Sequence, residues 1–153
     1  MGARVTSFMG LQRPDKPCGL ILSGLAGNII HGVPGSSAIS EALLASSIDD
    51  IKNEDAKGFR LFAERTGGDL KALAACIQTS RIKISGDELA QHIKMPVLIA
   101  LGDKDGIAGD PEELRHFIPH AEILMLEGKD HMSAVGARHH HEGVIAFLKR
   151  FSS

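Results

Sequence analysis

Acidic side chains follow one apolar run of the sequence, and a histidine follows another. The run MPVLIAL leads directly into GDKDGIAGD, whose carboxylates are those of Asp103, Asp105 and Asp110. The run AEILMLEG leads into KDHM, which contains His131. A carboxylate that accepts a hydrogen bond from one ring nitrogen of a histidine fixes its tautomer, so that the other nitrogen can act as a base. These residue types therefore predict an acid–base pair, provided that the two loops meet.

The elements around these loops predict that they do meet. Three short apolar runs, CGLILSG, MPVLIALG and AEILMLEG, have the length and composition of buried strands. The segments DPEELRHFI and HHHEGVIAFLKRF, which follow the second and third runs, have the pattern of helices. Strands that alternate with helices predict an α/β fold with a parallel sheet, in which the loops after neighbouring strands lie at one edge.

A long helical block interrupts this alternation. Residues 35–94 contain helix starts and ends but no strand signal, so we expect three parts: 1–34 and 95–153 in an α/β core, and 35–94 as a helical insert. Three parallel strands with such an insert form a poor free-standing domain. The pattern therefore indicates the second half of a larger fold.

The order of these motifs resembles the α/β-hydrolase superfamily over nearly the whole chain. Members of that family carry an acid loop of the form G-x-x-D with an apolar residue two positions on, then a helix, a strand and G-x-x-H. Laid on GDKDGIAG, the pattern selects Asp105, with Ile107 as the apolar residue, and it leaves Asp103 as a solvated neighbour. The family histidine falls on His131. The resemblance thus implies Asp105 and His131 as catalytic residues, and residues 35–94 as the cap domain.

The nucleophile expected from this resemblance is missing from the chain. No G-x-S-x-G motif occurs, and Ser23 has Ile21 and Leu25 where glycine is required. The opening MGARVTSFMGLQRPDKP resembles the family segment that follows the nucleophile, with MG as the end of G-x-S-M-G. The resemblance therefore implies a Ser-His-Asp triad whose serine lies upstream of this chain.

Two functions remain open from the sequence. The first is a fragment of a serine hydrolase whose parent cleaves carboxylic esters or related acyl bonds of small molecules, without a cofactor or metal. An aspartate nucleophile would instead allow epoxide or haloalkane hydrolysis, although the MG likeness favours serine. The second is an inactive, truncated hydrolase-like module that acts through association.

Other patterns in the chain are weaker. GDKDG lacks the acids of a calcium loop, with Leu114 at its twelfth position. SGLAGN lacks both the glycine spacing and the lysine of phosphate loops. The run RHHHEG spreads its histidines around a helix, so we expect a solvated helix start rather than a metal site.

Composition excludes several classes of partner. The net charge of −2 gives no basic surface for nucleic acid. No apolar stretch approaches the roughly 18 residues that a membrane-spanning helix needs. The two cysteines, Cys18 and Cys76, have no zinc spacing and fit a reduced, cytoplasmic setting.

The strand expected at Cys18–Gly24 carries a further prediction about partners. With the preceding strands of the hydrolase fold absent, one row of its backbone groups would be unpaired. We expect this edge to be covered, either by a companion N-terminal fragment or by self-association.

Overall fold

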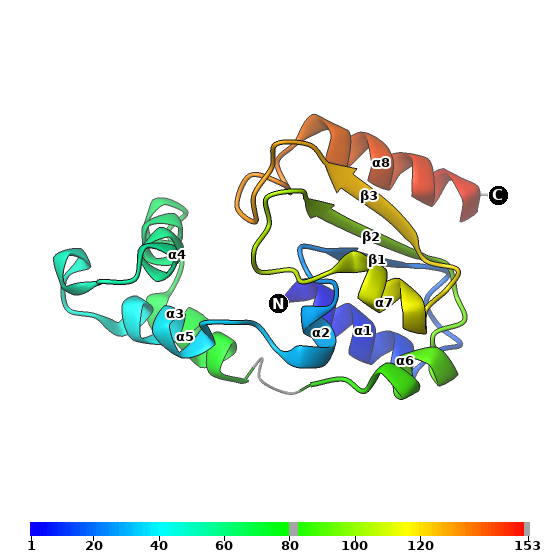
Figure 1. The fold of residues 1–153 in the computed structure, drawn as a ribbon, viewed down its shortest axis with the longest axis horizontal. Coiled ribbons are helices and arrows are strands. Elements are labelled where there is room, and N and C mark those ends of the chain that lie inside the picture. Colours follow the sequence, from blue (N-terminus) through cyan, green and yellow to red (C-terminus); the bar gives the residue numbers. More distant parts are fainter. Residues whose placement is uncertain (80–82, 152–153) are drawn as a thin grey trace. The chain divides into compact units, whose positions relative to one another are not determined.

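The computed structural model describes residues 1–79 and 83–151 (Figure 1). Its elements, in chain order, are α1 (Gly2–Gln12), β1 (Leu20–Ser23), α2 (Asn28–His31), α3 (Ser36–Leu44), η1 (Ile48–Asp50), α4 (Glu54–Arg65), α5 (Leu70–Thr79), α6 (Gly86–His92), β2 (Val97–Gly102), α7 (Pro111–Phe117), β3 (Glu122–Leu126), α8 (Arg138–Leu148) and η2 (Lys149–Phe151). The alternation of strands and helices predicted from the sequence is present.

The chain forms two compact units. One, here called the helical unit, comprises Gly32–Ile82 together with Met1, and the other, the sheet unit, comprises Gly2–His31 and Lys83–Ser153. The sequence places the second boundary of the insert at residue 94, whereas α6 belongs to the sheet unit. The physical reason is burial, because Leu89 and Ile93 are each only 1% exposed and Ile93 packs towards Gly10 of α1.

The sheet has three parallel strands in the order β1-β2-β3. Leu20 of β1 is opposite Val97 of β2, and Gly102 at the end of β2 is opposite Leu126 at the end of β3. All six residues of β2 are buried, as its continuous apolar run predicts. β3 is more open than its composition suggests, since Glu122 and Met125 are exposed at the edge of the described sheet.

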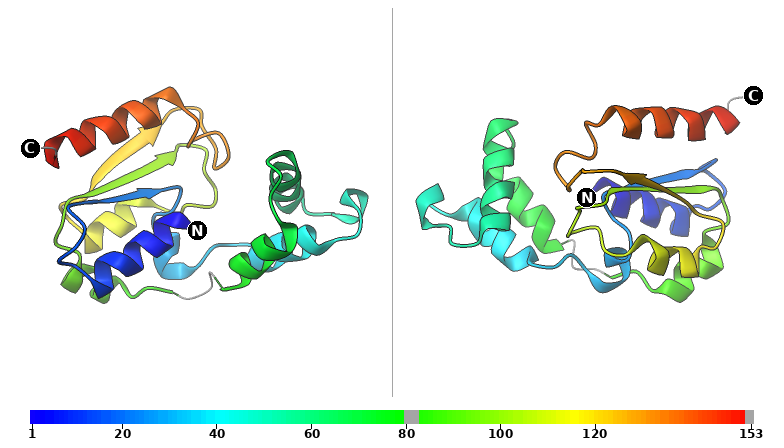
Figure 2. Two further views of the ribbon diagram at one scale, coloured as in Figure 1. Left: turned by 180° about the vertical axis from the view of Figure 1, so that it is seen from behind. Right: turned by 45° about the horizontal axis from the view of Figure 1, so that its top comes forward.

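Helices cover both faces of this sheet. Helix α8 lies on one face, and α1, α6 and α7 lie on the other (Figures 1 and 2). Phe147 of α8 is 2% exposed and lies close to Gly19, just before β1. The three layers bring the loops after β2 and β3 to the same edge of the sheet.

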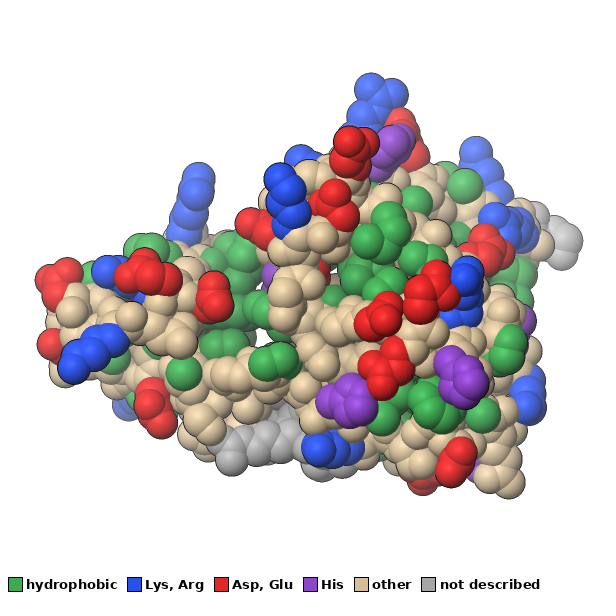
Figure 3. All heavy atoms as spheres, viewed as in Figure 1, with side chains coloured by type: hydrophobic (Ala, Val, Ile, Leu, Met, Phe, Trp, Pro, Cys, Tyr) green, Lys and Arg blue, Asp and Glu red, His purple; other side chains and the backbone are tan. Residues whose placement is uncertain are grey.

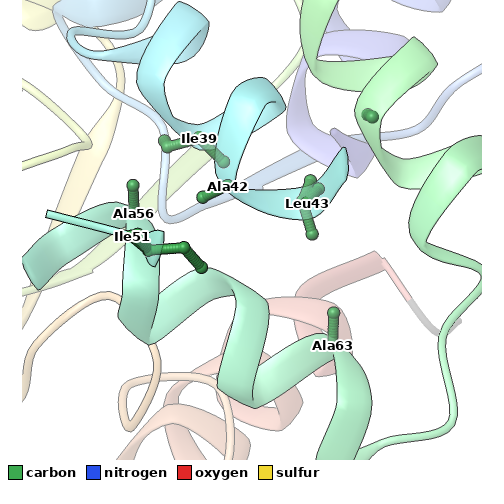
Figure 4. Close-up of a cluster of buried hydrophobic side chains, with 7 residues drawn as sticks. Ile39, Ala42, Leu43, Ile51, Ala56 and Ala63 are labelled. Atoms are coloured by element: carbon green, nitrogen blue, oxygen red, sulfur yellow. The ribbon is translucent and has the colours of Figure 1, made fainter. Parts of the chain in front are cut away.

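The helical unit has a core of its own, built from α3, α4 and α5. Its buried apolar residues are Ile39, Ala42, Leu43, Ile51, Ala56, Ala63 and Ala74. Figure 4 shows the side chains of α3 directed towards those of α4 across this core. Arg60 is also buried there, and its Nη1 donates hydrogen bonds to the carbonyl oxygens of Ala42, Leu43 and Ala45 at 3.0–3.1 Å. The arginine thereby satisfies the carbonyl groups at the end of α3.

Several helix starts are capped by side chains. Asp69 accepts hydrogen bonds from the N–H groups of Lys71 and Ala72, and Glu88 accepts one from the N–H of Ser85. The N-cap residue of α3 is Gly35, and Ser36 and Ser37 are the first residues of the helix. Among the described residues, no helix has the length and apolar character required to cross a membrane.

Charged side chains of both signs are interspersed over the face shown in Figure 3. Apolar side chains also reach this surface in several places. The large hydrophobic residues that are exposed in the sheet unit are Val5, Met9, Met125, Val135, Ile145 and Leu148.

Candidate active site

The candidate site is built on the loops that follow β2 and β3. At their base, the N–H of Asp103 donates to the carbonyl of Leu126 at 3.2 Å, and the N–H of Lys104 donates to that of Lys129 at 3.0 Å. A Cβ atom on Gly102 would lie 1.9 Å from the oxygen of Lys129. Only glycine allows this approach, so the two loops are held together at the end of the sheet.

Within these loops, Asp105 and His131 are in direct contact. Nδ1 of His131 lies 2.9 Å from Oδ2 of Asp105. The other carboxylate oxygen, Oδ1, accepts hydrogen bonds from the backbone N–H groups of Ile107 at 2.8 Å and Ala108 at 2.9 Å. The side chain of Asp105 is fully buried, whereas that of His131 is 28% exposed. The carboxylate is therefore fixed by the backbone on one side and meets the imidazole on the other.

The surroundings favour the ionised form of Asp105. Burial raises the pKa of this carboxyl, but the hydrogen bond from His131 and those from Ile107 and Ala108 outweigh burial and lower the pKa below its ordinary value. Because an ionised carboxylate only accepts hydrogen bonds, Nδ1 of His131 must carry the proton between them. The lone pair of the imidazole then lies on Nε2, which is the tautomer that a general base requires.

The other two acids of the loop lie elsewhere. Asp103 is exposed, as expected for a solvated neighbour. Asp110 is the N-cap residue of α7, and its Oδ1 accepts a hydrogen bond from the N–H of Glu112 at 2.9 Å. Of the three candidates, Asp105 is therefore the one that the structure brings to His131.

The loop after β1 supports the acid loop, a role that the sequence did not suggest. The N–H of Ala26 donates to the carbonyl of Ala108 at 2.7 Å, and Nδ2 of Asn28 donates to that of Ile107 at 2.8 Å. Gly109 has a φ of +79°, and a Cβ there would lie 2.4 Å from the nitrogen of Asn28. The glycine-rich LAGN segment thus uses its polar groups to hold the loop that carries Asp105.

Gly24 provides space for the histidine ring. It has a φ of +67°, and a Cβ on it would lie 3.2 Å from Cε1 and 3.5 Å from Nδ1 of His131. A glycine directly after a strand was the only signal of this contact in the sequence.

The run of histidines is only partly solvated. His139 and His141 are exposed, but His140 is 8% exposed, and its Nε2 lies 2.9 Å from Oγ of Ser23. The expectation of a fully solvated helix start is therefore wrong for His140, because this position of α8 faces the sheet. The described residues contain no group of three or more side chains arranged to hold a metal ion.

The strand expected at Cys18–Gly24 is shorter in the structure. β1 begins at Leu20, and Cys18 is exposed. The N–H groups of Leu20 and Gly24 donate to carbonyls of Pro96 and Ala100 along β2. In a parallel strand the intervening residues turn their backbone groups to the other side, so those of Ile21 and Ser23 face the open edge. No described strand pairs with that edge.

Comparisons with known proteins identify the fold. No protein-family model matches the sequence. No curated protein matches it either. Among solved structures, the chain is similar to a carboxylesterase of the thaumarchaeon Nitrososphaera gargenis, with a TM-score of 0.74 and 15% identity over 99% of this chain and 62% of that one.

Two further solved structures show the same likeness. E-2-(acetamidomethylene)succinate hydrolase matches 97% of this chain and 63% of its own, with a TM-score of 0.67 and 17% identity. The 2-hydroxy-6-oxo-6-phenylhexa-2,4-dienoate hydrolase of Rhodococcus sp. strain RHA1 matches all of this chain and 62% of its own, with a TM-score of 0.63 and 14% identity. The chain thus spans less than two thirds of the length of these hydrolases.

The fold class predicted from the sequence is confirmed by these structures. The chain has a partial α/β-hydrolase fold, in which parallel strands and their helices carry a separate helical unit.

Proposed function

We propose that this chain contributes the acid–base half of a serine-hydrolase active site. The observation that carries the proposal is the 2.9 Å contact between Nδ1 of His131 and the fully buried carboxylate of Asp105. Both residues stand at the carboxyl ends of neighbouring parallel strands, where α/β folds place their active sites. The hydrolases named above, which share this fold, support the same reaction class.

The proposed reaction uses the two residues in fixed roles. Nε2 of His131 takes the proton from a serine hydroxyl as its oxygen attacks the acyl carbon, and it returns that proton to the departing alcohol. A water molecule, deprotonated in the same way, then releases the acid and restores the serine. Asp105 orients the imidazole and stabilises its protonated form. No cofactor or metal takes part in this cycle.

Carboxylic esters of small molecules are the proposed substrates. A carboxylesterase is among the structural neighbours, and the acid–base pair suits acyl transfer in general. Hydrolysis of lactones, amides and activated carbon–carbon bonds would follow the same steps. We propose the helical unit as the cap domain of the hydrolase.

In this proposal the nucleophile lies outside the 153 residues. Helix α1 begins at Gly2, directly after Met1, which is 74% exposed. In G-x-S-x-G hydrolases the serine sits on a sharp turn between a strand and a helix, so a helix that begins here fits a serine just upstream. The missing share of the fold, seen in the coverage of about 62% of the hydrolase chains, leaves room for the nucleophile and the preceding strands.

A serine-reactive fluorophosphonate probe tests this assignment. If coding sequence upstream of Met1 encodes an in-frame G-x-S, the protein extended by that sequence should be labelled at that serine. His131→Ala in the extended protein should reduce labelling by about a thousandfold, because the serine loses its base. Labelling that is unchanged by His131→Ala would contradict the proposal.

A second candidate function is association without catalysis. Helix α1 buries Arg4 and Ser7 but exposes Val5 by 63% and Met9 by 46%. These exposed apolar residues lie one turn apart on the helix that packs beside β1, whose outer edge has no described partner strand. We propose that a further strand and its helix cover this surface, supplied by a companion N-terminal fragment or by a second copy of the chain.

A further inference from the structure

Ser23 and His140 form a buried contact beside the candidate site. Oγ of Ser23, at the end of β1, lies 2.9 Å from Nε2 of His140 in the first turn of α8. His140 is 8% exposed, and its Nδ1 is buried without a hydrogen-bond partner in the described part of the chain. A buried polar atom left unsatisfied costs stability, so packing alone does not account for a histidine at this position.

The contact lies next to His131 in space. Ser23 directly precedes Gly24, where a Cβ would lie only 3.2 Å from Cε1 of the His131 ring. His140 belongs to the helix that the His131 loop enters. The Ser23–His140 hydrogen bond therefore joins the end of the His131 loop to the strand against which the His131 ring rests.

The His131 loop has two other fixed points. At its beginning, the carbonyl of Lys129 accepts the hydrogen bond from the N–H of Lys104. Directly before the histidine, Oδ1 of Asp130 accepts hydrogen bonds from the N–H groups of Met132 at 3.1 Å and Ser133 at 2.8 Å. These bonds fix the beginning and the turn of the loop, while its far end is joined to β1 through His140.

Two other roles fit the pair less well. A nucleophile and its base need a third group that orients the base, and Nδ1 of His140 has no such partner in the described chain. A metal site would need further ligands, and the described residues offer no such group. A structural link to the His131 loop agrees with both observations.

We propose that Ser23 and His140 are positioning residues for His131. Their hydrogen bond fixes the first turn of α8 to the end of β1 and thereby keeps the His131 ring over Gly24 and in contact with Asp105. The inference rests on the proposed function for its catalytic meaning. The effect of the hydrogen bond on the mobility of the His131 ring can be measured without any enzymatic activity.

The test is the exchange of the His131 Nδ1 proton with water, followed by NMR on the 153-residue chain. A proton shared between an imidazole and a buried carboxylate exchanges slowly and gives a separate low-field signal, assigned here by its loss in His131→Gln. Ser23→Ala and His140→Phe should each accelerate this exchange by about tenfold, the effect of losing one hydrogen bond on local opening. Ser23→Thr keeps the hydroxyl and should retain slow exchange.

The matched control is His120→Gln. Nε2 of His120 also makes a single 2.9 Å contact, to the carbonyl of Met95 before β2, at the opposite end of the sheet from His131. This variant should leave the exchange rate within twofold of the unmodified chain. Equal acceleration in His120→Gln, or none in Ser23→Ala and His140→Phe, would overturn the positioning role while leaving the Asp105–His131 pair intact. An unmodified chain without the His131 signal would overturn both this inference and the proposed function.

Discussion

Gly24 and His131 lie so close together that a methyl group on the glycine would press against the imidazole, 3.2 Å from Cε1. The glycine also has a φ of +67°, a backbone conformation that residues with a side chain rarely adopt. The backbone just after β1 therefore lies against the ring. The position of the histidine thus depends on this contact as well as on its own loop.

Gly24→Ala should consequently affect both stability and the site. We expect a loss of about 1–2 kcal/mol in the free energy of unfolding from the left-handed backbone. The extra methyl group should also shift the NMR signals of the His131 ring. Gly128→Ala is the control, because Gly128 has the same φ of +67° but nothing within 4 Å of the place where its methyl group would lie. If both variants move the His131 signals equally, the contact at Gly24 has no influence on the ring.

Asp105→Asn should destabilise the fold in a pH-dependent way. The amide can still accept from Ile107 and Ala108, but its NH₂ then faces the Nδ1 proton of His131, which costs about 1–3 kcal/mol near pH 7. Because the folded pKa of Asp105 is lowered, the advantage of the aspartate is complete above its unfolded value of about 3.9 and is lost as the pH falls through the lower folded value.

Urea unfolding between pH 7 and pH 2 measures this difference. The matched control is Asp103→Asn, a change two positions away at an exposed side chain, which should shift stability by no more than about 0.5 kcal/mol. A stability difference between Asp105→Asn and the unmodified chain that persists to the lowest pH would show that the charge of Asp105 is not its cause.

The helical unit should depend on Arg60. Replacing this arginine by methionine keeps the apolar packing but removes the side-chain donor to three carbonyl oxygens near the end of α3. We expect a loss of about 2–3 kcal/mol, seen as faster hydrogen exchange in α3. Arg65→Met, at an exposed position of α4, the helix that also contains Arg60, should leave the exchange in α3 unchanged. Equal protection of α3 in both variants would contradict the capping role.

Part of this site could be predicted from the sequence because its signals are local. Asp105 and His131 each lie in the loop that follows an apolar strand, and the α/β pattern brings the two loops together. The contributions of Gly24, Asn28 and His140 depend on contacts across the fold. A glycine after a strand, or a histidine among histidines, has many explanations until the neighbouring element is known.

The open surface beside β1 should make the chain associate. Val5 is 63% exposed on α1, so Val5→Lys places a charge there without disturbing the core. If this face binds a second copy of the chain, the variant should lower the average mass measured by light scattering at high protein concentration. Ile145→Lys, at a residue 52% exposed on α8 across the sheet, is the control and should leave the mass unchanged. A chain that is monomeric at all concentrations, with or without Val5→Lys, would contradict self-association.

Hydrolysis of p-nitrophenyl acetate, with and without the residues encoded upstream of Met1, tests the central claim most directly. We predict no turnover above buffer by the 153-residue chain, because the proposed nucleophilic serine lies upstream of Met1. We predict turnover by the extended protein that falls by about a thousandfold in His131→Ala. Turnover by the 153-residue chain that is abolished by His131→Ala would contradict the claim that the nucleophile comes from outside this chain. Turnover by the extended protein at a rate that His131→Ala does not change would contradict the catalytic role of the Asp105–His131 pair.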